Sequence, residues 1–366
     1  MKLDSLSLYQ FRNYRDLQLE FTPGVNLIVG ENAQGKTNLL EAISYLGSGK
    51  SFRAQKNSEL VLFGAEYAQI EGKLYSQERN QQLKWVLYPS KARQLYHNGV
   101  KKRTAGEISG VFQTVLFCPE DLMVLKTGAS SRRRLGDQAL CQLRPNYEAA
   151  LFEYTRILDQ KSRILKDRFE NPAFLEVLPE YNTRLCQVGA LLISYRARFY
   201  EGLGKAAKEY HTLFSGGKEE FSLAYQTVST VTDPFASVSV LTGQLQDHLE
   251  SHYRAELESC QCLTGPHKDD FEVSLSGLSV KAFGSQGQTR TAAISLKLAQ
   301  RELMERESGE IPVLLLDDVL SELDAARQDF VLNQIDKGQV FISCCDSDRF
   351  TTLGKTVAIH NGAVVE

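Results

Sequence analysis

The sequence predicts an α/β fold that is interrupted by a mainly helical second lobe, and three observations lead to this class. A short apolar run at 24–29 leads into a glycine-bearing loop and then a helical pattern. A second apolar run, Ile311–Leu316, ends in two aspartates near the other end of the chain. Between these runs, apolar residues recur three and four positions apart, which is the spacing of one helical face. Both ends of the chain are therefore expected to build the α/β part.

The N-terminal third is expected to add an antiparallel sheet beside the α/β core. Residues 3–14 are predicted to form a strand that ends in Phe11-Arg12-Asn13-Tyr14. From 67 to 102, apolar and polar residues alternate, which is typical of strands with one buried face. The Asn98-Gly99 dipeptide within this stretch suits a tight hairpin turn.

Two helices are predicted in the middle of the chain, because apolar residues there alternate three and four positions apart. Two interpretations remain open: the helices pack as a short antiparallel arm, or they form ordinary core faces of a helical lobe. The apolar positions are Tyr147, Leu151, Tyr154 and Leu158 in the first helix, and Leu178, Tyr181, Leu185, Val188, Leu192, Tyr195 and Phe199 in the second.

Composition excludes several classes of protein. The chain of 366 residues is 42% hydrophobic and 24% charged, which fits a folded protein of two lobes rather than a disordered one. No apolar run reaches the roughly 18 residues of a membrane span, and the N-terminus resembles no secretory signal, so a cytoplasmic protein is expected. The seven cysteines include no CxxC pair, so we expect no metal or disulfide role for them. The net charge of −3 means that any DNA-binding face has to be local.

Residues Gly30–Thr37 match the phosphate-loop pattern G-x-x-x-x-G-K-[ST] in its required place between a strand and a helix. The glycines let backbone N–H groups curl around phosphate oxygens, and the helix N-terminus adds positive potential. Lys36 is predicted to contact the β- and γ-phosphates of ATP, and Thr37 to place its hydroxyl on Mg²⁺. The predicted ATP-binding residues are Gly30, Glu31, Asn32, Ala33, Gln34, Gly35, Lys36 and Thr37.

The matching carboxylates follow the apolar strand at 311–316. Asp317 is predicted to hold the Mg²⁺ shell, and Asp318 to orient or deprotonate the attacking water. In the alternative interpretation, Asp318 only caps the following loop. Lys36 and Asp317 lie much farther apart than a compact nucleotide fold requires, which indicates an insertion. We therefore expect residues 1–125 and 265–366 to form the α/β head, and residues 126–264 the inserted helical lobe.

The segment 283–290 has the sequence Phe-Gly-Ser-Gln-Gly-Gln-Thr-Arg and precedes a predicted helix. The Ser285 hydroxyl, the Gly287 N–H and the helix N-terminus together suit an anion site, with Gln288 beside them. Taken alone, the segment is equally compatible with a plain glycine turn. Placed between the phosphate loop and Asp317, it resembles the signature of ABC-type ATPases. That resemblance implies a homodimer that closes head-to-tail on two ATP molecules, each signature completing the nucleotide site of the other subunit.

Further motifs make the chain similar to the RecF family of DNA replication and repair proteins. They run in family order along most of the chain, and the Gly-Pro-His-basic-Asp-Asp motif followed by the signature is the most specific pair. The motifs are Phe11-Arg12-Asn13-Tyr14, Gly30–Thr37, Ser51-Phe52-Arg53, Phe117-Cys118-Pro119-Glu120-Asp121, Arg132-Arg133-Arg134 with Asp137, Gly265-Pro266-His267-Lys268-Asp269-Asp270 and Gly284–Arg290.

The resemblance implies an ABC-type ATPase head, with mixed sheets around a phosphate-loop helix, related to the heads of SMC and Rad50 proteins. It places Arg12 and Asn13 at the nucleotide and implies a weak, DNA-dependent ATPase whose main role is ATP-gated binding to duplex or gapped DNA. It also implies cooperation with RecR and RecO in loading RecA. An SMC- or Rad50-like tether and another ABC-type ATPase subunit are the alternatives, and a tether needs longer arms than the predicted helices provide.

The chain departs from ABC patterns at three places. Phe117-Cys118-Pro119 lies where many of these ATPases have a glutamine, and Ser343-Cys344-Cys345 lies where many have a histidine. Asp318 replaces the glutamate of transporters. Slow hydrolysis is the expected consequence.

Basic clusters are the predicted DNA contacts, through phosphates rather than bases. In the alternative interpretation, each cluster is a solvated surface. The clusters are Lys101, Lys102 and Arg103, and Arg132, Arg133 and Arg134, with Lys91 and Arg93 in addition.

Overall fold

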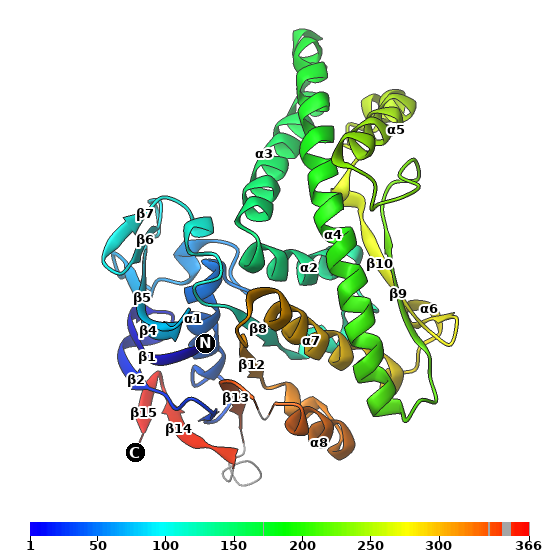
Figure 1. Ribbon diagram of the computed structural model, residues 1–366. Helices are drawn as coiled ribbons and strands as arrows, with labels where there is room; N and C mark the ends of the chain where they lie inside the picture. The colour runs from blue at the N-terminus through cyan, green and yellow to red at the C-terminus, as the bar shows by residue number, and fades with distance from the viewer. Residues whose placement is uncertain (171, 336, 346–352, 366) are drawn as a thin grey trace. The chain divides into compact units, whose positions relative to one another are not determined.

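The computed structural model describes residues 1–170, 172–335, 337–345 and 353–365 (Figure 1). Its contacts divide the chain into two units, residues 1–123 with 290–366, and residues 124–289. The first boundary is close to the predicted one, but the second follows the signature instead of preceding residue 265. The reason is that β10 (Asp270–Leu275) pairs with β9 (Phe221–Gln226), which ties this stretch to the inserted unit.

The first unit begins with a six-stranded antiparallel sheet in the order β2-β1-β4-β5-β6-β7. Residues on one face of β4 are buried at every second position, as the alternating sequence predicted. Asn98 and Gly99, with φ of 49° and 76°, form the two-residue turn between β6 and β7. The strands are β1 (Lys2–Phe11), β2 (Tyr14–Glu20), β4 (Ala68–Ser76), β5 (Arg79–Leu87), β6 (Gln94–His97) and β7 (Val100–Lys102).

The second sheet of this unit has the order β15-β14-β3-β13-β12-β8, and its strands are parallel except at β15. Parallel strands buried on both faces need continuous apolar runs, which β12 and β13 have. The carboxyl ends of β3 and β12 lie at one edge of the sheet, where ligands of such sheets bind. The strands are β3 (Val25–Val29), β8 (Thr114–Phe117), β12 (Val313–Asp317), β13 (Val340–Cys344), β14 (Lys355–His360) and β15 (Ala363–Val365).

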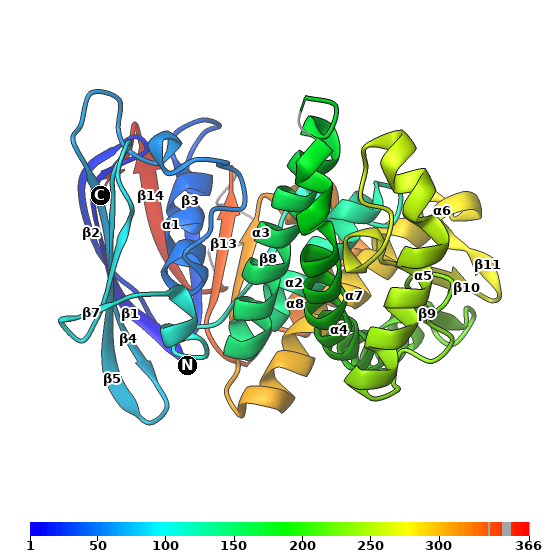
Figure 2. The same ribbon diagram turned by 90° about the horizontal axis from the view of Figure 1, so that it is seen from above.

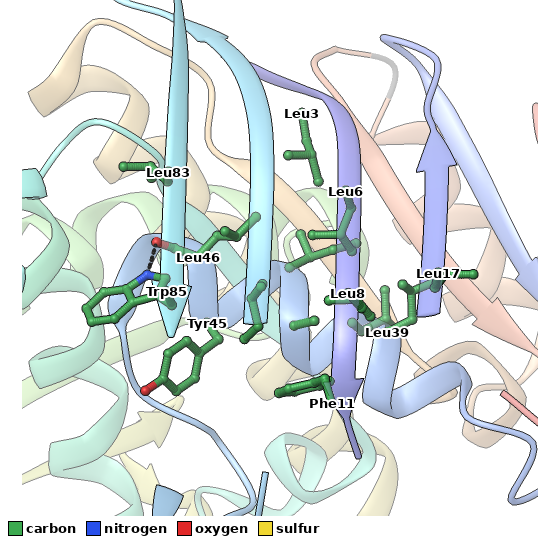
Figure 3. Packing of buried hydrophobic residues seen from close by; sticks show 14 of the residues in the cluster. Leu3, Leu6, Leu8, Phe11, Leu17, Leu39, Tyr45, Leu46, Leu83 and Trp85 are labelled. Carbon is green, nitrogen blue, oxygen red and sulfur yellow. Dashed lines mark hydrogen bonds between the residues drawn. The ribbon is translucent and has the colours of Figure 1, made fainter. Parts of the chain in front are cut away.

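Helix α1 (Lys36–Ser48) joins the two sheets of the first unit into one core (Figure 2). Figure 3 shows Leu39, Tyr45 and Leu46 of α1 among the apolar residues of the first sheet. The indole Nε1 of Trp85 donates a hydrogen bond to the Leu46 carbonyl at 3.1 Å. The helix that begins at the phosphate loop is therefore fixed along its length.

The remaining helices of the first unit are short, apart from α7, which crosses the boundary between the units. They are α7 (Gln286–Ser308), α8 (Ala325–Asn333), η1 (Asn57–Glu59), η2 (Ala105–Ile108), η3 (Pro119–Met123) and η6 (Val319–Glu322).

The second unit is mainly helical, as predicted, and also contains the three-stranded antiparallel sheet β11-β10-β9. Helix α4 packs against α3, α5 and β9, so both predicted helices form core faces of this unit. In α3 the buried face includes Tyr147 and Tyr154, whereas Leu151 and Leu158 are half-buried. None of the described helices is long and apolar enough to cross a membrane. The elements not yet given are α2 (Ala129–Leu143), α3 (Pro145–Asp167), η4 (Pro172–Val177), α4 (Leu178–Ser215), α5 (Val238–Ser259), η5 (Pro266–Lys268), β11 (Leu278–Ser279) and α6 (Val280–Phe283).

Candidate nucleotide site and signature segment

The phosphate loop connects β3 to α1 and curls around the side chain of Lys36. Lys36 is 3% exposed, and its Nζ donates to the carbonyls of Gly30 at 2.8 Å and Glu31 at 3.0 Å. Three residues of the loop have a positive φ: Gly30 at 158°, Ala33 at 64° and Gly35 at 122°. The ammonium is therefore held at the loop, where it can meet an anion that the backbone N–H groups surround.

The turn after β1 supports the phosphate loop from behind. Asn13 Nδ2 donates to the Gln34 carbonyl at 3.0 Å, and the Tyr14 hydroxyl donates to the Gly35 carbonyl at 2.9 Å. Asn38 Nδ2, from the first turn of α1, donates to Asn13 Oδ1 at 2.8 Å. Asn13, predicted to bind the nucleotide, thus contacts the loop itself.

Arg12, the other residue of this turn that was predicted to bind the nucleotide, is held by a buried carboxylate. Its Nε and Nη2 donate to the two oxygens of Glu41 at 2.8 and 2.9 Å, and its Nη1 donates to the Glu59 carbonyl at 2.8 Å. Glu41 is fully buried and also accepts a hydrogen bond from the Ser51 hydroxyl. These bonds fix the Arg12 guanidinium against α1, and Arg12 also lines a neighbouring cavity.

That cavity of about 630 Å³ lies entirely within the first unit, next to the phosphate-loop helix. Its lining combines polar and charged residues with apolar ones, among them Phe63, whose side chain is fully exposed. Its size suits a flat heterocycle with a sugar. The lining residues are Arg12, Asn13, Asn38, Arg53, Ser58, Glu59, Val61, Leu62, Phe63, Gly64, Ala65 and Pro89.

Thr37 and Asp317 meet at the edge of the parallel sheet, although they lie at opposite ends of the sequence. The Thr37 hydroxyl donates to Asp317 Oδ1 at 3.0 Å, and the Ser343 hydroxyl donates to the same oxygen at 2.8 Å. Burial raises the pKa of Asp317, and the hydrogen bonds from Ser343 and Thr37 oppose that rise. A carboxylate and a hydroxyl at this separation are hard oxygen ligands of the kind that Mg²⁺ prefers.

Asp318 follows with its backbone in the left-handed region, at φ 50°. Its N–H donates to the Ser343 hydroxyl oxygen at 2.8 Å, so Ser343 bridges both aspartates. At the start of η6, Asp318 makes no side-chain capping hydrogen bond to any described residue. In the described chain Asp318 therefore does not cap η6 through its side chain, and both interpretations of Asp318 stay predictions. Sequence reasoning noted Ser343 only as a departure from the histidine pattern.

Cys345 is a second residue whose position the sequence did not reveal. Its exposed thiol donates to Asn32 Oδ1 at 3.0 Å and accepts from Lys36 Nζ at 3.4 Å. The end of β13 therefore contacts the phosphate loop through a thiol.

The signature segment lies in the second unit, at the start of α7. Ser285 is exposed, and its hydroxyl oxygen accepts from the Gln288 N–H at 3.2 Å. In return, the Gln288 side-chain oxygen accepts from the Ser285 N–H at 2.9 Å. This reciprocal pair is a capping box, which differs from a plain glycine turn because it starts a helix. Gly287 lies inside this first turn.

The predicted DNA contacts differ sharply in exposure. Lys101, Arg103 and Arg134 are exposed, whereas Lys102 is half-buried. Arg133 is also half-buried and donates to the Asp269 carbonyl at 2.6 Å.

The prediction is wrong for Arg132. Its side chain is 2% exposed, and its Nε and Nη2 form a bidentate pair with Asp270 at 2.6 and 2.7 Å. Its Nη1 donates to the carbonyl of Thr127 at 2.6 Å. Arg132 therefore joins α2 to β10 inside the second unit and is not available to a DNA phosphate.

Comparisons with known proteins agree along nearly the whole chain. A model of the RecF/RecN/SMC N-terminal domain family matches residues 2–363. The DNA replication and repair protein RecF of Acetivibrio thermocellus is 36% identical over 350 residues, which cover 96% of this chain and 95% of that relative. RecF of Clostridium perfringens is 34% identical over 368 residues, which cover 100% and 99% of the two chains.

Solved structures give the same result for the fold. The structure of the recombination mediator protein RecF–ATPrS in the RecFOR pathway matches with a TM-score of 0.92 at 34% identity, covering 99% of this chain and 97% of that one. An Smc head domain from Pyrococcus yayanosii matches with a TM-score of 0.57 at 15% identity, covering 100% and 96% of the two chains, which supports the fold alone. The predicted fold class, an α/β ATPase head, is confirmed.

Proposed function

This chain belongs to the RecF family of DNA replication and repair proteins, with its ATP-binding head of the ABC type, and we propose that ATP closes two copies of it head-to-tail on DNA. The proposal rests on the hydrogen bond from the Thr37 hydroxyl to Asp317, next in sequence to the buried Lys36. Residues from both ends of the chain meet there to form one phosphate-binding and cation-binding edge.

Nucleotide binding is proposed to use the phosphate loop and the adjoining cavity. The loop N–H groups and Lys36 hold the β- and γ-phosphates, and the cavity beside Arg12 and Asn13 receives the base and ribose. The apolar residues 61–65 suit the faces of a base, and the polar side suits its edge and the ribose hydroxyls.

The Thr37–Asp317 pair fits Mg²⁺ as a cofactor. The Thr37 hydroxyl and the Asp317 carboxylate would hold the ion, which would neutralise charge on the phosphates of the nucleotide. The burial of Asp317 fits this assignment, because a buried carboxylate without a cation is costly. Ser343 holds the Asp317 carboxylate in the orientation that faces Thr37.

Hydrolysis is proposed to depend on Asp318, which orients or deprotonates the attacking water. The side chain of aspartate is one methylene shorter than that of glutamate, so water is less well placed and turnover is slow. Slow turnover suits a protein in which ATP binding closes the dimer and hydrolysis opens it. The enzyme is then a weak, DNA-dependent ATPase.

Dimer closure is proposed to use Ser285, Gly287 and Gln288. A capped, exposed helix N-terminus with a serine hydroxyl is suited to the γ-phosphate held by a second copy. Each copy then supplies a phosphate loop to one nucleotide and a signature to the other.

The closed dimer is proposed to bind the phosphates of duplex or gapped DNA. The proposed location is the cytoplasm. The exposed candidates are Lys101, Arg103 and Arg134, with Lys102 and Arg133 partly exposed beside them. Because the related solved structure is a recombination mediator of the RecFOR pathway, RecR and RecO are the proposed partners, with RecA loading as the outcome.

The test compares binding of a labelled gapped duplex, with and without ATP, to Lys36→Ala and Asp318→Asn. The proposal predicts that ATP tightens DNA binding by the wild type and by Asp318→Asn, but not by Lys36→Ala. If all three proteins bind DNA equally with and without ATP, the ATP-closed clamp is refuted.

A further inference from the structure

Three side chains of the second unit form a continuous chain that ends at the signature. Gln288 Nε2 donates to Glu219 Oε1 at 2.7 Å, and Glu219 Oε2 lies 2.9 Å from His211 Nε2. His211 belongs to the last turns of α4, and Glu219 to the loop between α4 and β9. The signature cap is therefore connected to the end of the longest helix of this unit.

The Glu219 carboxylate determines which way the Gln288 amide points. A carboxylate only accepts hydrogen bonds, so the amide nitrogen has to face Glu219. The amide oxygen is then left facing the Ser285 N–H, which is the bond that closes the capping box. A flipped amide would break both bonds. The same network lowers the pKa of Glu219, mainly through the Gln288 hydrogen bond, so the carboxylate remains charged at neutral pH.

The cap leaves the Ser285 hydroxyl ready for an acceptor. Its oxygen is already used by the Gln288 N–H, and this bond fixes the oxygen at the start of α7. Its hydrogen is still available to donate to an anion, because Ser285 is exposed.

His211 holds the far oxygen of Glu219 from inside the unit. The His211 side chain is fully buried and packs against Phe221, with 5.5 Å between ring centroids. Because the carboxylate accepts, Nε2 carries the hydrogen in the neutral tautomer. Nδ1 has no hydrogen-bond partner among the described residues. In the described chain, the polar contact that holds the His211 ring is therefore the one between Nε2 and Glu219.

We propose that Glu219, anchored by His211, is a positioning residue that sets the signature cap for the γ-phosphate of a nucleotide held by a second copy. The inference rests on the proposed function of Ser285. Glu219 itself contacts neither the nucleotide nor Mg²⁺ in this proposal. It acts by fixing Gln288, and through Gln288 the N-terminus of α7.

The neighbouring residue provides a matched control. Glu220 also pairs with a basic residue of α4, Lys208, at 2.9 Å, but its side chain is 73% exposed. Its hydrogen bonds join it to Lys208 and Ser276, and in the described chain these bonds do not reach the signature. Removing either carboxylate changes the net charge equally, so only the position differs.

The experiment measures ATP-dependent dimerisation by sedimentation, and affinity for labelled ATP at protein concentrations where the chain is monomeric. Glu219→Ala is expected to raise the protein concentration for half-dimerisation roughly tenfold, the loss that one hydrogen bond to a charged group produces. Monomer ATP affinity is expected to stay at the wild-type value, whereas the unfolding temperature is expected to fall by roughly a few degrees, because the buried His211 ring loses its partner. Glu219→Gln is expected to restore dimerisation, because its amide oxygen still accepts from Gln288 and His211 can move its proton to Nδ1. Glu220→Ala is expected to match the wild type.

A Ser285→Arg variant separates failure of this inference from failure of the proposed function. If Ser285→Arg blocks dimerisation while Glu219→Ala dimerises normally, the positioning role is refuted and the signature function stands. If neither variant changes ATP-dependent assembly, the proposed function fails as well. If Glu219→Ala lowers monomer ATP affinity by the same factor as it weakens dimerisation, or if Glu219→Gln does not restore dimerisation, Glu219 is structural, and the inference is overturned.

Discussion

The phosphate loop and the signature both place a helix N-terminus where it can bind phosphate, yet they are supported in very different ways. The phosphate loop is held by Asn13, Tyr14 and the buried Lys36, and α1 behind it is packed between two sheets. The signature has an exposed serine, a capping box of two residues and a single carboxylate behind it.

This difference indicates that the two sites bind in different circumstances. The phosphate loop has its lysine, its hydroxyl and its aspartate in place within one unit, so a single copy is expected to bind ATP. The signature offers the Ser285 hydroxyl and a helix N-terminus, and its capping box consists of two uncharged residues, Ser285 and Gln288. It is expected to bind only a phosphate that is already held elsewhere.

The largest effect is expected for Lys36→Ala. Loss of the buried ammonium removes a charge-assisted contact to the phosphates and leaves the carbonyls of Gly30 and Glu31 without their donor. Affinity for ATP should fall on the order of 100-fold, measured with labelled nucleotide. Ser285→Arg serves as the control and should bind ATP normally as a monomer. If both variants lost ATP affinity equally, the phosphate loop and the signature would not differ in how they bind ATP.

Asp318→Asn is expected to change turnover while it leaves binding intact. The amide cannot act as a base, so the hydrolysis rate should fall roughly 100-fold in a single-turnover assay. ATP affinity should stay within a few-fold of the wild type, because Lys36, Thr37 and Asp317 are unchanged. A normal hydrolysis rate in this variant would show that a group other than Asp318 orients or deprotonates the attacking water.

Gly35→Ala tests how tightly the phosphate loop is supported. An added Cβ would lie 2.7 Å from Asn13 Nδ2 and 2.9 Å from the Tyr14 hydroxyl oxygen, at a φ of +122°. The free energy of unfolding should fall by about 1–3 kcal/mol. Gly24→Ala is the matched control in the same unit, since a Cβ there meets no described atom within 4 Å. The free energy of unfolding of both variants is measured with denaturant. Equal values would show that the phosphate loop can move to accommodate the added methyl group.

The last effect concerns the pH dependence of the stability of the second unit. His267 accepts from the Tyr154 hydroxyl at 2.7 Å through Nδ1 and donates to the Cys262 carbonyl at 2.9 Å through Nε2. Burial lowers the pKa of His267 from 6.5 to about 4. The unfolded chain therefore binds the proton more readily, and stability should fall as pH drops from about 6.5 towards 4, by at most about 1.4 kcal/mol per pH unit.

His267→Gln is the comparison for this pH effect. Its amide can make similar bonds but does not titrate, so the difference in unfolding free energy between the two proteins should change with pH only inside that window. A constant difference across the window would contradict a buried neutral histidine.

Much of the nucleotide site was predictable because its chemistry depends on short sequence patterns. Gly30–Thr37 follows an apolar strand and starts a helix, and Asp317 ends another apolar strand. Parallel strands bring their carboxyl ends to one edge, so the approach of Asp317 to Thr37 follows from the fold class.

The parts that were not predictable depend on contacts between distant segments. Nothing local distinguishes Arg132, which is buried against Asp270, from Arg134, which is exposed two positions later. Helical phase decides that difference, and a run of three arginines does not reveal its phase. The second domain boundary was missed for a similar reason, since it depends on the pairing of β9 with β10. Ser343 and Cys345 gave no signal either, because their roles arise only where β13 lies beside β3 and β12.

If the signature of one copy completes the nucleotide site of another, Ser285→Arg should uncouple ATP binding from DNA binding. Affinity for a labelled gapped duplex is measured with and without ATP, for the wild type and for this variant. We expect ATP to tighten binding by the wild type, and the variant to lose this gain while it still binds ATP. If the variant keeps the full ATP-dependent gain, or if ATP does not affect wild-type binding, the head-to-tail DNA clamp is contradicted.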